Sequence, residues 1–362
     1  MSNDSTTQST AERTSGEGER LTQSAANGDG ARATSPAASV LEVRDLHVRF
    51  GRGDRPVRAV KGLSYSLSAG TTLAIIGESG SGKTVSSRAL MGLLPETATV
   101  TGSVLFDGDD LLGLSDKEMR RHRGASIAMV FQDPARSLNP TMRVGAQITE
   151  AIRAHLALDR GAARERAIEL LQLVRLPAPR QRFFEYPHQL SGGMRQRVVI
   201  AIALACRPRV LIADEATSSL DVTTQAQIME LLRDIQRQLG MALIMISHDL
   251  GLAASYADEV IVMYAGRAVE YAPTRKLFAH VRMPYTKALL EAIPRVERPS
   301  HTPFPVTPGH PPDLTDLPSG CPFAPRCFNS RDECREEAPP FAEHEPDHWW
   351  ACWYPCDDGG PE

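Results

Sequence analysis

Short, continuous apolar runs occupy residues 73–76, 210–213 and 243–246. Runs of this length and composition are typical of parallel strands that are buried on both faces. Polar residues follow each run, and the carboxyl ends of parallel strands meet at one edge of their sheet. The pattern therefore predicts an α/β fold with its functional site at that edge.

Apolar and polar residues alternate over 40–50 and 63–67, which is the pattern of half-buried strands. Together with residues 102–107, these segments predict an antiparallel layer beside the parallel sheet. Residues 141–186 are expected to be mainly helical, and residues 198–206 to form a long core helix. The apolar positions of the first helical region are Leu156, Leu158, Ile168, Leu170, Leu171, Leu173 and Val174.

Composition changes this picture mainly at the ends of the chain. Residues 1–38 contain one leucine and no aromatic residue, and such a segment cannot bury enough apolar surface to fold. Residues 294–318 are proline-rich, as in a linker. No apolar stretch approaches the ~18 residues that cross a membrane, and no secretory signal is visible. We therefore expect a cytosolic protein that reaches a membrane only through a partner.

Charge argues against a nucleic-acid-binding protein. The formal net charge is −4, so the chain as a whole does not attract phosphate backbones. Residues 120–123 form a local basic cluster, which we interpret as a solvated helix end. The length of 362 residues corresponds to about two domains at ~150 residues each.

A phosphate-binding loop of the pattern G-x-x-x-x-G-K-[ST] follows the run at 73–76. The matching residues are Gly77, Glu78, Ser79, Gly80, Ser81, Gly82, Lys83 and Thr84. The glycines let backbone N–H groups converge on phosphate oxygens at a helix N-terminus. We expect Lys83 to reach the β- and γ-phosphates of a nucleotide and Thr84 to ligate Mg²⁺.

Two carboxylates end the apolar run at 210–213. Asp214 is placed to hold Mg²⁺, directly or through water. Glu215, one residue further, can act as the general base that polarises the attacking water. Together with the phosphate-binding loop, this pair predicts nucleotide hydrolysis.

A second glycine-containing helix start lies at residues 190–197. Ser191 is a good helix N-cap, and Gly192 and Gly193 let another molecule approach the helix closely. Such a helix start attracts anions, so it could bind the γ-phosphate of a nucleotide held by another subunit. A purely structural cap is the alternative.

Residues 190–196 resemble the signature motif of the ATP-binding cassette family, and the resemblance extends over about residues 41–290. Met194 stands where glutamine is commonest, and Ala216 stands where the family usually has proline. The resemblance implies a P-loop NTPase (RecA-like) core with an antiparallel β subdomain and a helical subdomain at about 135–190. It also implies a head-to-tail dimer that holds two ATP molecules between phosphate loops and opposing signature helices.

Other positions match the family individually. Gln132 resembles the glutamine that senses Mg²⁺, and His248 resembles the switch histidine that contacts the γ-phosphate. Asp221 ends a segment that resembles the loop crossing the dimer interface. Phe50 is our choice for the aromatic residue that stacks on adenine, and Tyr65 is its rival, although its strand position favours the core.

The cysteines at the C-terminus raise the question of a metal. Cys321, Cys327, Cys334 and Cys352 are separated by five, six and seventeen residues, and Cys356 lies beyond them. Zinc sites usually have closer pairs, and ferredoxin spacings do not match. The spacing alone indicates a soft-metal site or free thiols.

Residues 308–312 and 320–327 are similar to the C-terminal extension of ATPase subunits in oligopeptide, dipeptide and nickel importers. That resemblance implies a [4Fe–4S] cluster ligated by Cys321, Cys327, Cys334 and Cys352. His344 and His348 are competing ligands that a thiolate-rich site would not prefer. Cys356 is then a spare thiol, and Cys206 a core residue.

These observations predict the ATP-hydrolysing subunit of an importer for di- or oligopeptides, with nickel or another small solute as the alternative. We expect a disordered tail (1–38), a nucleotide-binding domain (39–290) and a cysteine-rich extension (291–362). The implied partners are a second ATPase chain in a heterodimer, two transmembrane permeases and an extracytoplasmic solute-binding protein. A DNA-repair or ribosomal cassette and a redox protein that only binds ATP are rivals from other classes. The expected location is the cytoplasmic face of the membrane.

Overall fold

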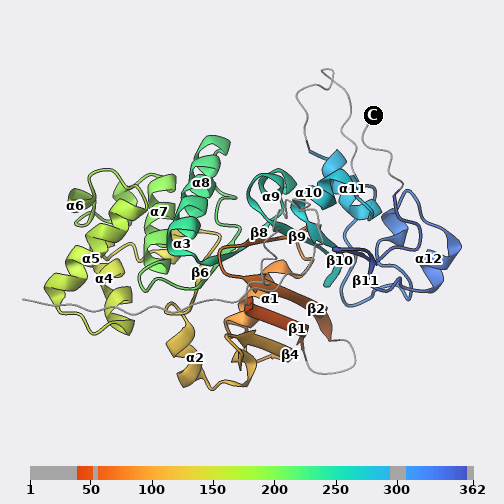
Figure 1. Cartoon of the computed structure of the whole chain (residues 1–362), viewed down its shortest axis with the longest axis horizontal. Coiled ribbons are helices and arrows are strands. Elements are labelled where there is room, and N and C mark those ends of the chain that lie inside the picture. Colours follow the sequence, from red (N-terminus) through yellow and green to blue (C-terminus); the bar gives the residue numbers. More distant parts are fainter. Residues whose placement is uncertain (1–38, 52–55, 294–306, 357–362) are drawn as a thin grey trace, which may run out of the picture. The chain divides into compact units, whose positions relative to one another are not determined.

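A central eight-stranded sheet runs through the part of the chain that the computed structural model describes, residues 39–51, 56–293 and 307–356 (Figure 1). In the order in which they lie side by side, its strands are β11 (Ala342–Glu345), β12 (His348–Trp350), β10 (Arg267–Pro273), β9 (Glu259–Tyr264), β3 (Thr72–Ile76), β8 (Ala242–Ser247), β7 (Val210–Asp214) and β6 (Ile127–Val130). The strands from β9 to β6 are mutually parallel. Strands β3, β6, β7 and β8 are buried along their whole length, which explains their continuous apolar sequences.

The register of the parallel strands brings the ends of β3, β7 and β8 to one edge. Ile76 of β3 lies beside Ser247 of β8, and Ile246 of β8 lies beside Asp214 of β7. The residues that follow these strands therefore emerge close together, as the sequence predicts.

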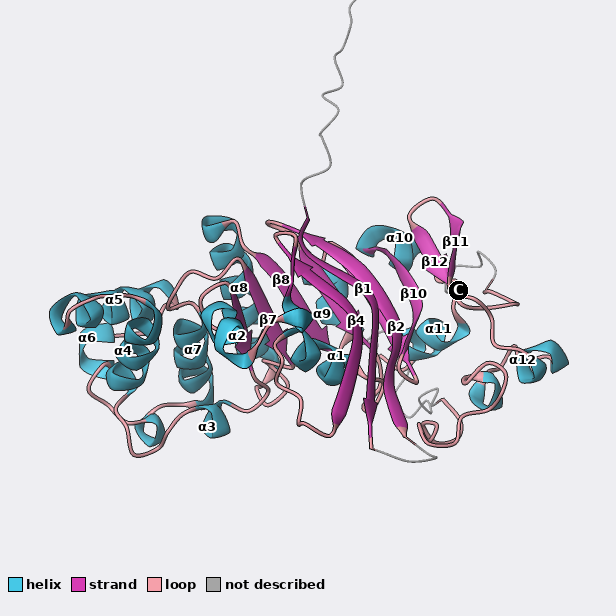
Figure 2. Ribbon diagram, turned by 90° about the horizontal axis from the view of Figure 1, so that it is seen from below, coloured by secondary structure: helices cyan, strands magenta, loops and turns pink. Residues whose placement is uncertain are grey.

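A four-stranded antiparallel sheet packs against one face of the central sheet (Figure 2). Its strands, in order, are β2 (Val57–Ser68), β1 (Ser39–Phe50), β4 (Ala98–Phe106) and β5 (Asp109–Asp110). Successive side chains of β3 point to opposite faces of the central sheet, so they contribute to two different hydrophobic cores. Leu73 and Ile75 pack with the antiparallel sheet, whereas Ala74 and Ile76 pack with the helices on the other face.

The helices cover the parallel strands and form a separate group beyond β6 and β7, where Figures 1 and 2 show α4 to α7 side by side. The α-helices are α1 (Lys83–Leu90), α2 (Asp116–His122), α3 (Pro134–Ser137), α4 (Val144–His155), α5 (Arg160–Leu173), α6 (Pro179–Arg182), α7 (Gly192–Ala203), α8 (Val222–Leu239), α9 (Leu250–Tyr256), α10 (Thr274–Ala279), α11 (Pro284–Glu291) and α12 (Asp332–Glu336). The 3₁₀ turns are η1 (Leu111–Gly113), η2 (Pro187–Gln189) and η3 (Ala324–Arg326). In the described ranges, no helix combines the length and apolarity needed to span a membrane.

The fold class predicted from the sequence is confirmed, but the bounds of one helix were wrong. Helix α7 spans Gly192–Ala203 rather than 198–206. It starts early because the Ser191 side chain accepts a hydrogen bond from the Met194 N–H group at 3.3 Å, which caps the helix despite its two glycines. It ends early because Leu204 is its C-cap and residues 204–206 form a turn instead of continuing the helix.

The cysteine-rich extension continues the central sheet. Strand β12 pairs antiparallel with β10, so that Trp349 lies opposite Tyr271, and the two rings stack at 5.1 Å. Strand β11 then pairs with β12 at the outer edge. A domain boundary near residue 290 stays a prediction, since the sheet runs on across it. The predicted tail (1–38) and residues 294–306 of the proline-rich segment lie outside the described residues.

A fully buried acid–base pair joins the extension to the core. His348 of β12 contacts Glu270 of β10 through Nε2 and Oε1 at 3.0 Å, and neither side chain is exposed to solvent. The Arg282 N–H group also donates to the same carboxylate oxygen, at 2.7 Å. Removing His348 leaves the Glu270 carboxylate buried without its imidazole partner, and the Arg282 N–H group alone does not replace that partner.

Replacing His348 by leucine should therefore lower the free energy of unfolding by about 3–5 kcal/mol, measured by urea denaturation. His47→Leu is the matched control, because His47 and Asp45 form a similar 2.9 Å contact on the surface, with side chains 47% and 77% exposed. Exposed pairs contribute about 0–1 kcal/mol. Equal losses for the two variants would contradict the role of burial.

Candidate functional site

The phosphate-binding loop connects β3 to α1 in a shape that requires glycine. Gly77, Gly80 and Gly82 have φ values of 152°, 82° and 103°, where L side chains are strained. A Cβ atom on Gly77 would lie 2.2 Å from the Met263 carbonyl oxygen, and one on Gly82 would lie 2.4 Å from the Ala59 carbonyl oxygen. The loop can therefore approach these carbonyl oxygens only because the motif has glycine at positions 77 and 82.

Lys83 is folded back over the loop. Its side chain is buried, and Nζ donates to the carbonyl oxygens of Gly77 at 2.7 Å and Glu78 at 2.8 Å. Burial lowers the pKa of Lys83, and the nearby carboxylates of Glu215, Asp214 and Glu78 oppose that shift. The Lys83 ammonium group is thus bound to carbonyl oxygens of the loop, and the oxygens of a phosphate could take their place.

Thr84 and Asp214 contact each other at the start of α1 and the end of β7. The Thr84 hydroxyl donates to Asp214 Oδ1 at 2.8 Å. Burial raises the pKa of Asp214, and the hydrogen bond from Thr84 partly counters the shift. A hydroxyl and a carboxylate are the oxygen ligands that Mg²⁺ prefers, so these residues fit that ion.

Glu215 meets two side chains from other elements. Its Oε2 accepts a hydrogen bond from Gln132 Nε2 at 2.8 Å, and its Oε1 lies 3.8 Å from His248 Nδ1. Glu215 itself has a φ of 48°, and its N–H group donates to the Ile246 carbonyl at 3.0 Å. This backbone bond to β8 fixes the strained residue, with the buried Ala216 following where the resembled family usually has proline.

The segments predicted to face a second subunit lie apart from the loop of their own chain. Figures 1 and 2 show α7, which Ser191 caps, at the edge of the helical group nearest the central sheet, and in both views it is set apart from α1. Asp221 caps α8 by accepting the Thr224 N–H at 3.0 Å, and this bond lowers the pKa of Asp221. Gly193 is packed closely, since a Cβ there would lie 2.7 Å from Thr224 Cγ2. Ser191, Gly192 and Asp221 are exposed.

The two candidate adenine-stacking residues differ in burial. Phe50 is half-buried at the end of β1, opposite Val57 of β2. Tyr65 is 6% exposed and packs within the core between the two sheets, and burial raises the pKa of its hydroxyl. Tyr65 is therefore a core residue, as the sequence predicts, and the stacking of Phe50 on adenine stays a prediction.

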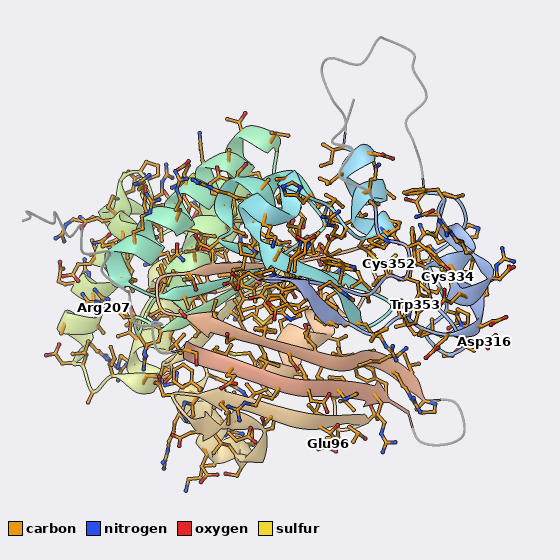
Figure 3. All side chains as sticks on the ribbon, turned by 45° about the vertical axis from the view of Figure 1, so that its right-hand side comes forward. Glu96, Arg207, Asp316, Cys334, Cys352 and Trp353 are labelled. Carbon is orange, nitrogen blue, oxygen red and sulfur yellow. The ribbon has the colours of Figure 1, made fainter. Side chains whose placement is uncertain are left out.

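The predicted cluster cysteines lie together in the extension, where Figure 3 labels Cys334 and Cys352. Burial raises the pKa of Cys352 to about 12, and mutual repulsion with Cys321, Cys327 and Cys334 adds to the shift. The N–H group of Asn329 donates to Cys327 Sγ at 3.3 Å. Main-chain N–H groups also lower the pKa of Cys321 and Cys352 against the effect of burial.

This arrangement has the donor set of a thiolate site but not the geometry of a single ion. Within the described residues, no group of three or more His, Cys, Asp or Glu side chains is placed to hold a metal ion. His348 contacts Glu270 through Nε2, and neither it nor His344 belongs to a metal-holding group in the described part of the chain.

Comparison with known proteins identifies the chain. The model of the family "ABC transporter" matches residues 60–218, and the model "Oligopeptide/dipeptide transporter, C-terminal region" matches residues 269–334. The oligopeptide transport ATP-binding protein OppD of Salmonella typhimurium is 47% identical over 90% of this chain and 97% of its own length. The dipeptide transport ATP-binding protein DppD of Bacillus subtilis is 49% identical over 87% of this chain and 94% of its own length.

The chain belongs to the ATP-binding subunits of ABC transporters, in their oligopeptide/dipeptide group.

Solved structures agree with this assignment. The ABC transporter cassette MJ0796, solved as a dimer, is 28% identical and covers 65% of this chain and 99% of its own, with a TM-score of 0.58. The same cassette was also solved in a post-hydrolysis state bound to ADP and Pi, with the same identity, coverage and TM-score. The predicted ATPase activity is confirmed at the level of the family.

Sequence reasoning missed residues of this ABC ATPase that hold the phosphate-binding loop from outside. Arg326 of the extension and Tyr285 of α11 both contact Glu78. The available signal was Glu78 itself, because a carboxylate in a phosphate-binding loop needs a cation nearby to offset its charge.

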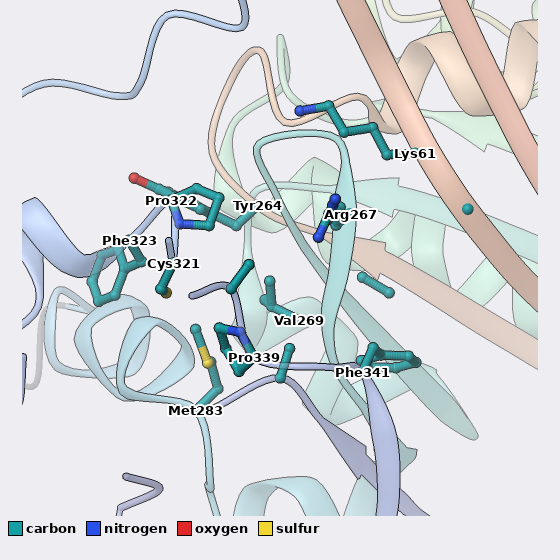
Figure 4. A pocket seen from close by; sticks show the side chains of 14 residues that line it. Lys61, Tyr264, Arg267, Val269, Met283, Cys321, Pro322, Phe323, Pro339 and Phe341 are labelled. Carbon is teal, nitrogen blue, oxygen red and sulfur yellow. The ribbon is translucent and has the colours of Figure 1, made fainter. Parts of the chain in front are cut away.

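The extension packs on the core around a small cavity, shown in Figure 4. The cavity has a volume of about 150 Å³ and is lined mainly by apolar side chains, including Val269, Met283, Cys321, Phe323 and Phe341. Ligand sites are usually larger, at about 300–1,000 Å³, so the cavity is a packing gap rather than a binding site.

Proposed function

We propose that this chain binds and hydrolyses ATP at the edge formed by β3, β7 and β8, and that hydrolysis energises the import of di- or oligopeptides. The main support is the convergence of Lys83, Thr84, Asp214 and Glu215 at that edge, where one ATP with its metal would satisfy all four. The family of the chain makes ATP the nucleotide.

The proposed roles follow from the contacts. The N–H groups of the loop and Lys83 bind the phosphates, and Thr84, Asp214 and Gln132 hold Mg²⁺, which neutralises phosphate charge. Glu215 takes the proton from the attacking water. Its carboxylate is 16% exposed, whereas the His248 side chain is 59% exposed and can rotate towards the γ-phosphate. Gln132, which donates to Glu215 in this structure, links the base to the start of the helical group.

We propose that the site is completed by a second ATPase chain. The exposed start of α7 at Ser191 and Gly192, with the adjoining Gly193, would bind the γ-phosphate held by the partner, because a capped helix N-terminus attracts anions. Asp221 lies in the segment that would cross the dimer interface beside this site. The dimeric state of the structurally similar cassette supports this arrangement. A heterodimer is our preferred composition.

The permeases are proposed to dock beside the helical group. A cavity of about 330 Å³ lies between β6 and α7, lined by mostly apolar residues that include Phe131, Ser137, Val199 and Ile202. The Phe131 side chain is exposed although it is large and apolar, and it directly precedes Gln132. A short permease helix in this cavity would therefore contact the segment that reaches Glu215. In this proposal the chain is a peripheral subunit at the cytoplasmic face, and the solute-binding protein acts through the permeases.

Peptides are favoured over nickel because the similar proteins are named for oligopeptide and dipeptide transport. The test is uptake of a labelled tripeptide and of nickel ions by the native host, with the wild-type chain or Glu215→Gln. Loss of peptide uptake alone is expected. Loss of nickel uptake alone would contradict the peptide assignment.

We further propose that Cys321, Cys327, Cys334 and Cys352 ligate a [4Fe–4S] cluster. The support is their proximity and the N–H groups directed at three of their sulfur atoms. A four-iron cluster is wider than one ion, so its thiolates need not converge on a point. Hydrogen bonds to cluster sulfurs are usual in such sites.

Serine at any one of these four positions should abolish the bound iron and acid-labile sulfide of anaerobically purified protein. Cys356→Ser and Cys206→Ser are the controls, because both keep the four proposed ligands. Wild-type protein that contains zinc or no metal would contradict the cluster.

A further inference from the structure

A bidentate ion pair joins the phosphate-binding loop to the cysteine-rich extension. Arg326 Nη1 donates to Glu78 Oε2 at 2.8 Å, and Arg326 Nη2 donates to Glu78 Oε1 at 2.9 Å. The two residues are 248 positions apart in the sequence. The arginine side chain is 7% exposed and the glutamate side chain 23%, so water screens this pair much less than a surface pair.

The other contacts of Arg326 hold its guanidinium in one place. Nε donates to the Pro308 carbonyl at 3.0 Å, and Nη1 also donates to the Tyr264 hydroxyl at 3.2 Å. The guanidinium carbon lies 5.9 Å from the ring centres of both Tyr264 and Phe323. These contacts orient the Arg326 guanidinium group independently of its bonds to Glu78.

Glu78 is held at its main chain as well. Its N–H group donates to the Tyr285 hydroxyl at 2.8 Å, and its carbonyl oxygen accepts from Lys83 at 2.8 Å. The rings of Tyr264, Tyr285 and Phe323 contact one another, with centroids 4.5–5.3 Å apart. The second residue of the phosphate-binding loop is thus fixed from the C-terminal part of the chain.

We propose that Arg326 is a positioning residue for ATP: it neutralises Glu78 and holds it so that the loop can accept phosphate. This inference rests on the proposed ATP site and extends that site into the cysteine-rich extension. An unpaired Glu78 carboxylate would repel the phosphates of ATP from within the loop that must bind them. Arginine suits the role because its planar fork matches a carboxylate with two bonds, which lysine cannot do.

Arg326 lies between two of the cysteines of the extension. Arg326 ends η3 and directly precedes Cys327, while Cys321 lies just before η3. The Cys321 N–H group in turn donates to the Cys334 carbonyl at 2.7 Å. The arginine that faces the phosphate-binding loop is therefore carried by the segment that the cysteines organise.

The test compares the KM for ATP and kcat of the assembled transporter carrying wild type, Arg326→Gln, Glu78→Gln or both substitutions. Arg326→Gln should raise the KM for ATP about tenfold or more and change kcat less than about threefold, since repulsion acts on binding. Salt should reduce this defect, because it screens the uncompensated charge. The double variant should recover a KM within about threefold of wild type, because the repelling carboxylate is gone.

Arg282→Gln is the matched control. Arg282 also makes a double contact with a carboxylate, through Nε and Nη2 to Glu345 at 3.1 and 2.7 Å, but away from the phosphate-binding loop. Its loss should lower the melting temperature and leave the KM for ATP unchanged.

An unchanged KM in Arg326→Gln, or a double variant with the summed defects of the single ones, would overturn the proposal. If Arg326→Gln does not assemble, Arg326→Lys carries the test, with a smaller rise in KM in the same direction and the same two ways to fail. A wild-type transporter that binds no ATP would instead refute the proposed function.

Discussion

Replacing Glu215 by glutamine should lower ATP hydrolysis at this chain's site by at least about a hundredfold while ATP stays bound. A positioned general base contributes about 10²–10⁴ to a rate, and the amide cannot accept the proton of the attacking water. Glutamine keeps the size of the side chain and can still contact Gln132 and His248. Single-turnover hydrolysis of labelled ATP in the assembled transporter measures the effect, because the variant site should retain its ATP uncleaved.

Glu230→Gln is the control for this change. Glu230 lies on α8 and pairs with Arg233, where the side chains are 45% and 34% exposed. The same change from acid to amide there should leave both ATP binding and hydrolysis at the wild-type level. Hydrolysis that continues unchanged in Glu215→Gln would remove the base from the proposed mechanism.

Replacing Gly82 by alanine should disable the phosphate-binding loop. The residue has a φ of 103°, and its new Cβ would lie 2.4 Å from the Ala59 carbonyl oxygen, a backbone atom that cannot rotate away. Backbone strain costs about 1–3 kcal/mol, and overpacking costs about 1–3 kcal/mol more. We expect ATP affinity to fall by about a hundredfold or more, measured by nucleotide binding, because the N–H groups no longer converge.

Gly70→Ala is the control that separates backbone strain from the steric clash of the new Cβ atom. Gly70 also has a positive φ, 74°, but its Cβ would meet open space in the turn between β2 and β3. This variant should lose about 1–2 kcal/mol of stability through strain alone and bind ATP normally. A Gly82→Ala variant with normal ATP affinity would show that the loop tolerates the displacement.

Local patterns were sufficient to predict the core of the fold. The runs at 73–76, 210–213 and 243–246 form β3, β7 and β8, because strands buried on both faces must be apolar throughout. The phosphate-binding loop follows from eight consecutive residues whose chemistry acts locally. Asp214 and Glu215 could be placed beside that loop because parallel strands end at one edge.

The rest depended on contacts between distant parts of the chain. No local pattern indicates that β12 would pair with β10, since a strand of three residues is too short for a periodic signal. The ion pair of Glu78 and Arg326 spans 248 positions, and although the carboxylate of Glu78 indicates that a cation lies nearby, no local pattern indicates that Arg326 supplies it. The sequence indicates Ser191 as a helix N-cap, but the low helix propensity of Gly192 and Gly193 favours a later start for α7; in the structure the Ser191 cap decides where the helix begins.

The arrangement of the cysteines also could not be predicted from local sequence patterns. Their spacing left a soft-metal site and free thiols open, because ligand geometry is set by the fold of the extension rather than by sequence distance. The fold brings Cys321, Cys327, Cys334 and Cys352 close enough to shift one another's pKa. Within the described residues no group of three or more His, Cys, Asp or Glu side chains is placed to hold a metal ion, so both alternatives stay open and the cluster stays a proposal.

The central claim is that ATP hydrolysis at Glu215 drives peptide import. The most direct test of this claim is uptake of a labelled tripeptide into vesicles that contain the complete transporter. The solute-binding protein and the tripeptide are added on one side of the membrane, and ATP is supplied on the side that carries this chain. Uptake should require ATP with the wild-type chain and should be nearly abolished with Glu215→Gln. Uptake at the wild-type rate with Glu215→Gln, or uptake that needs no ATP, would contradict it.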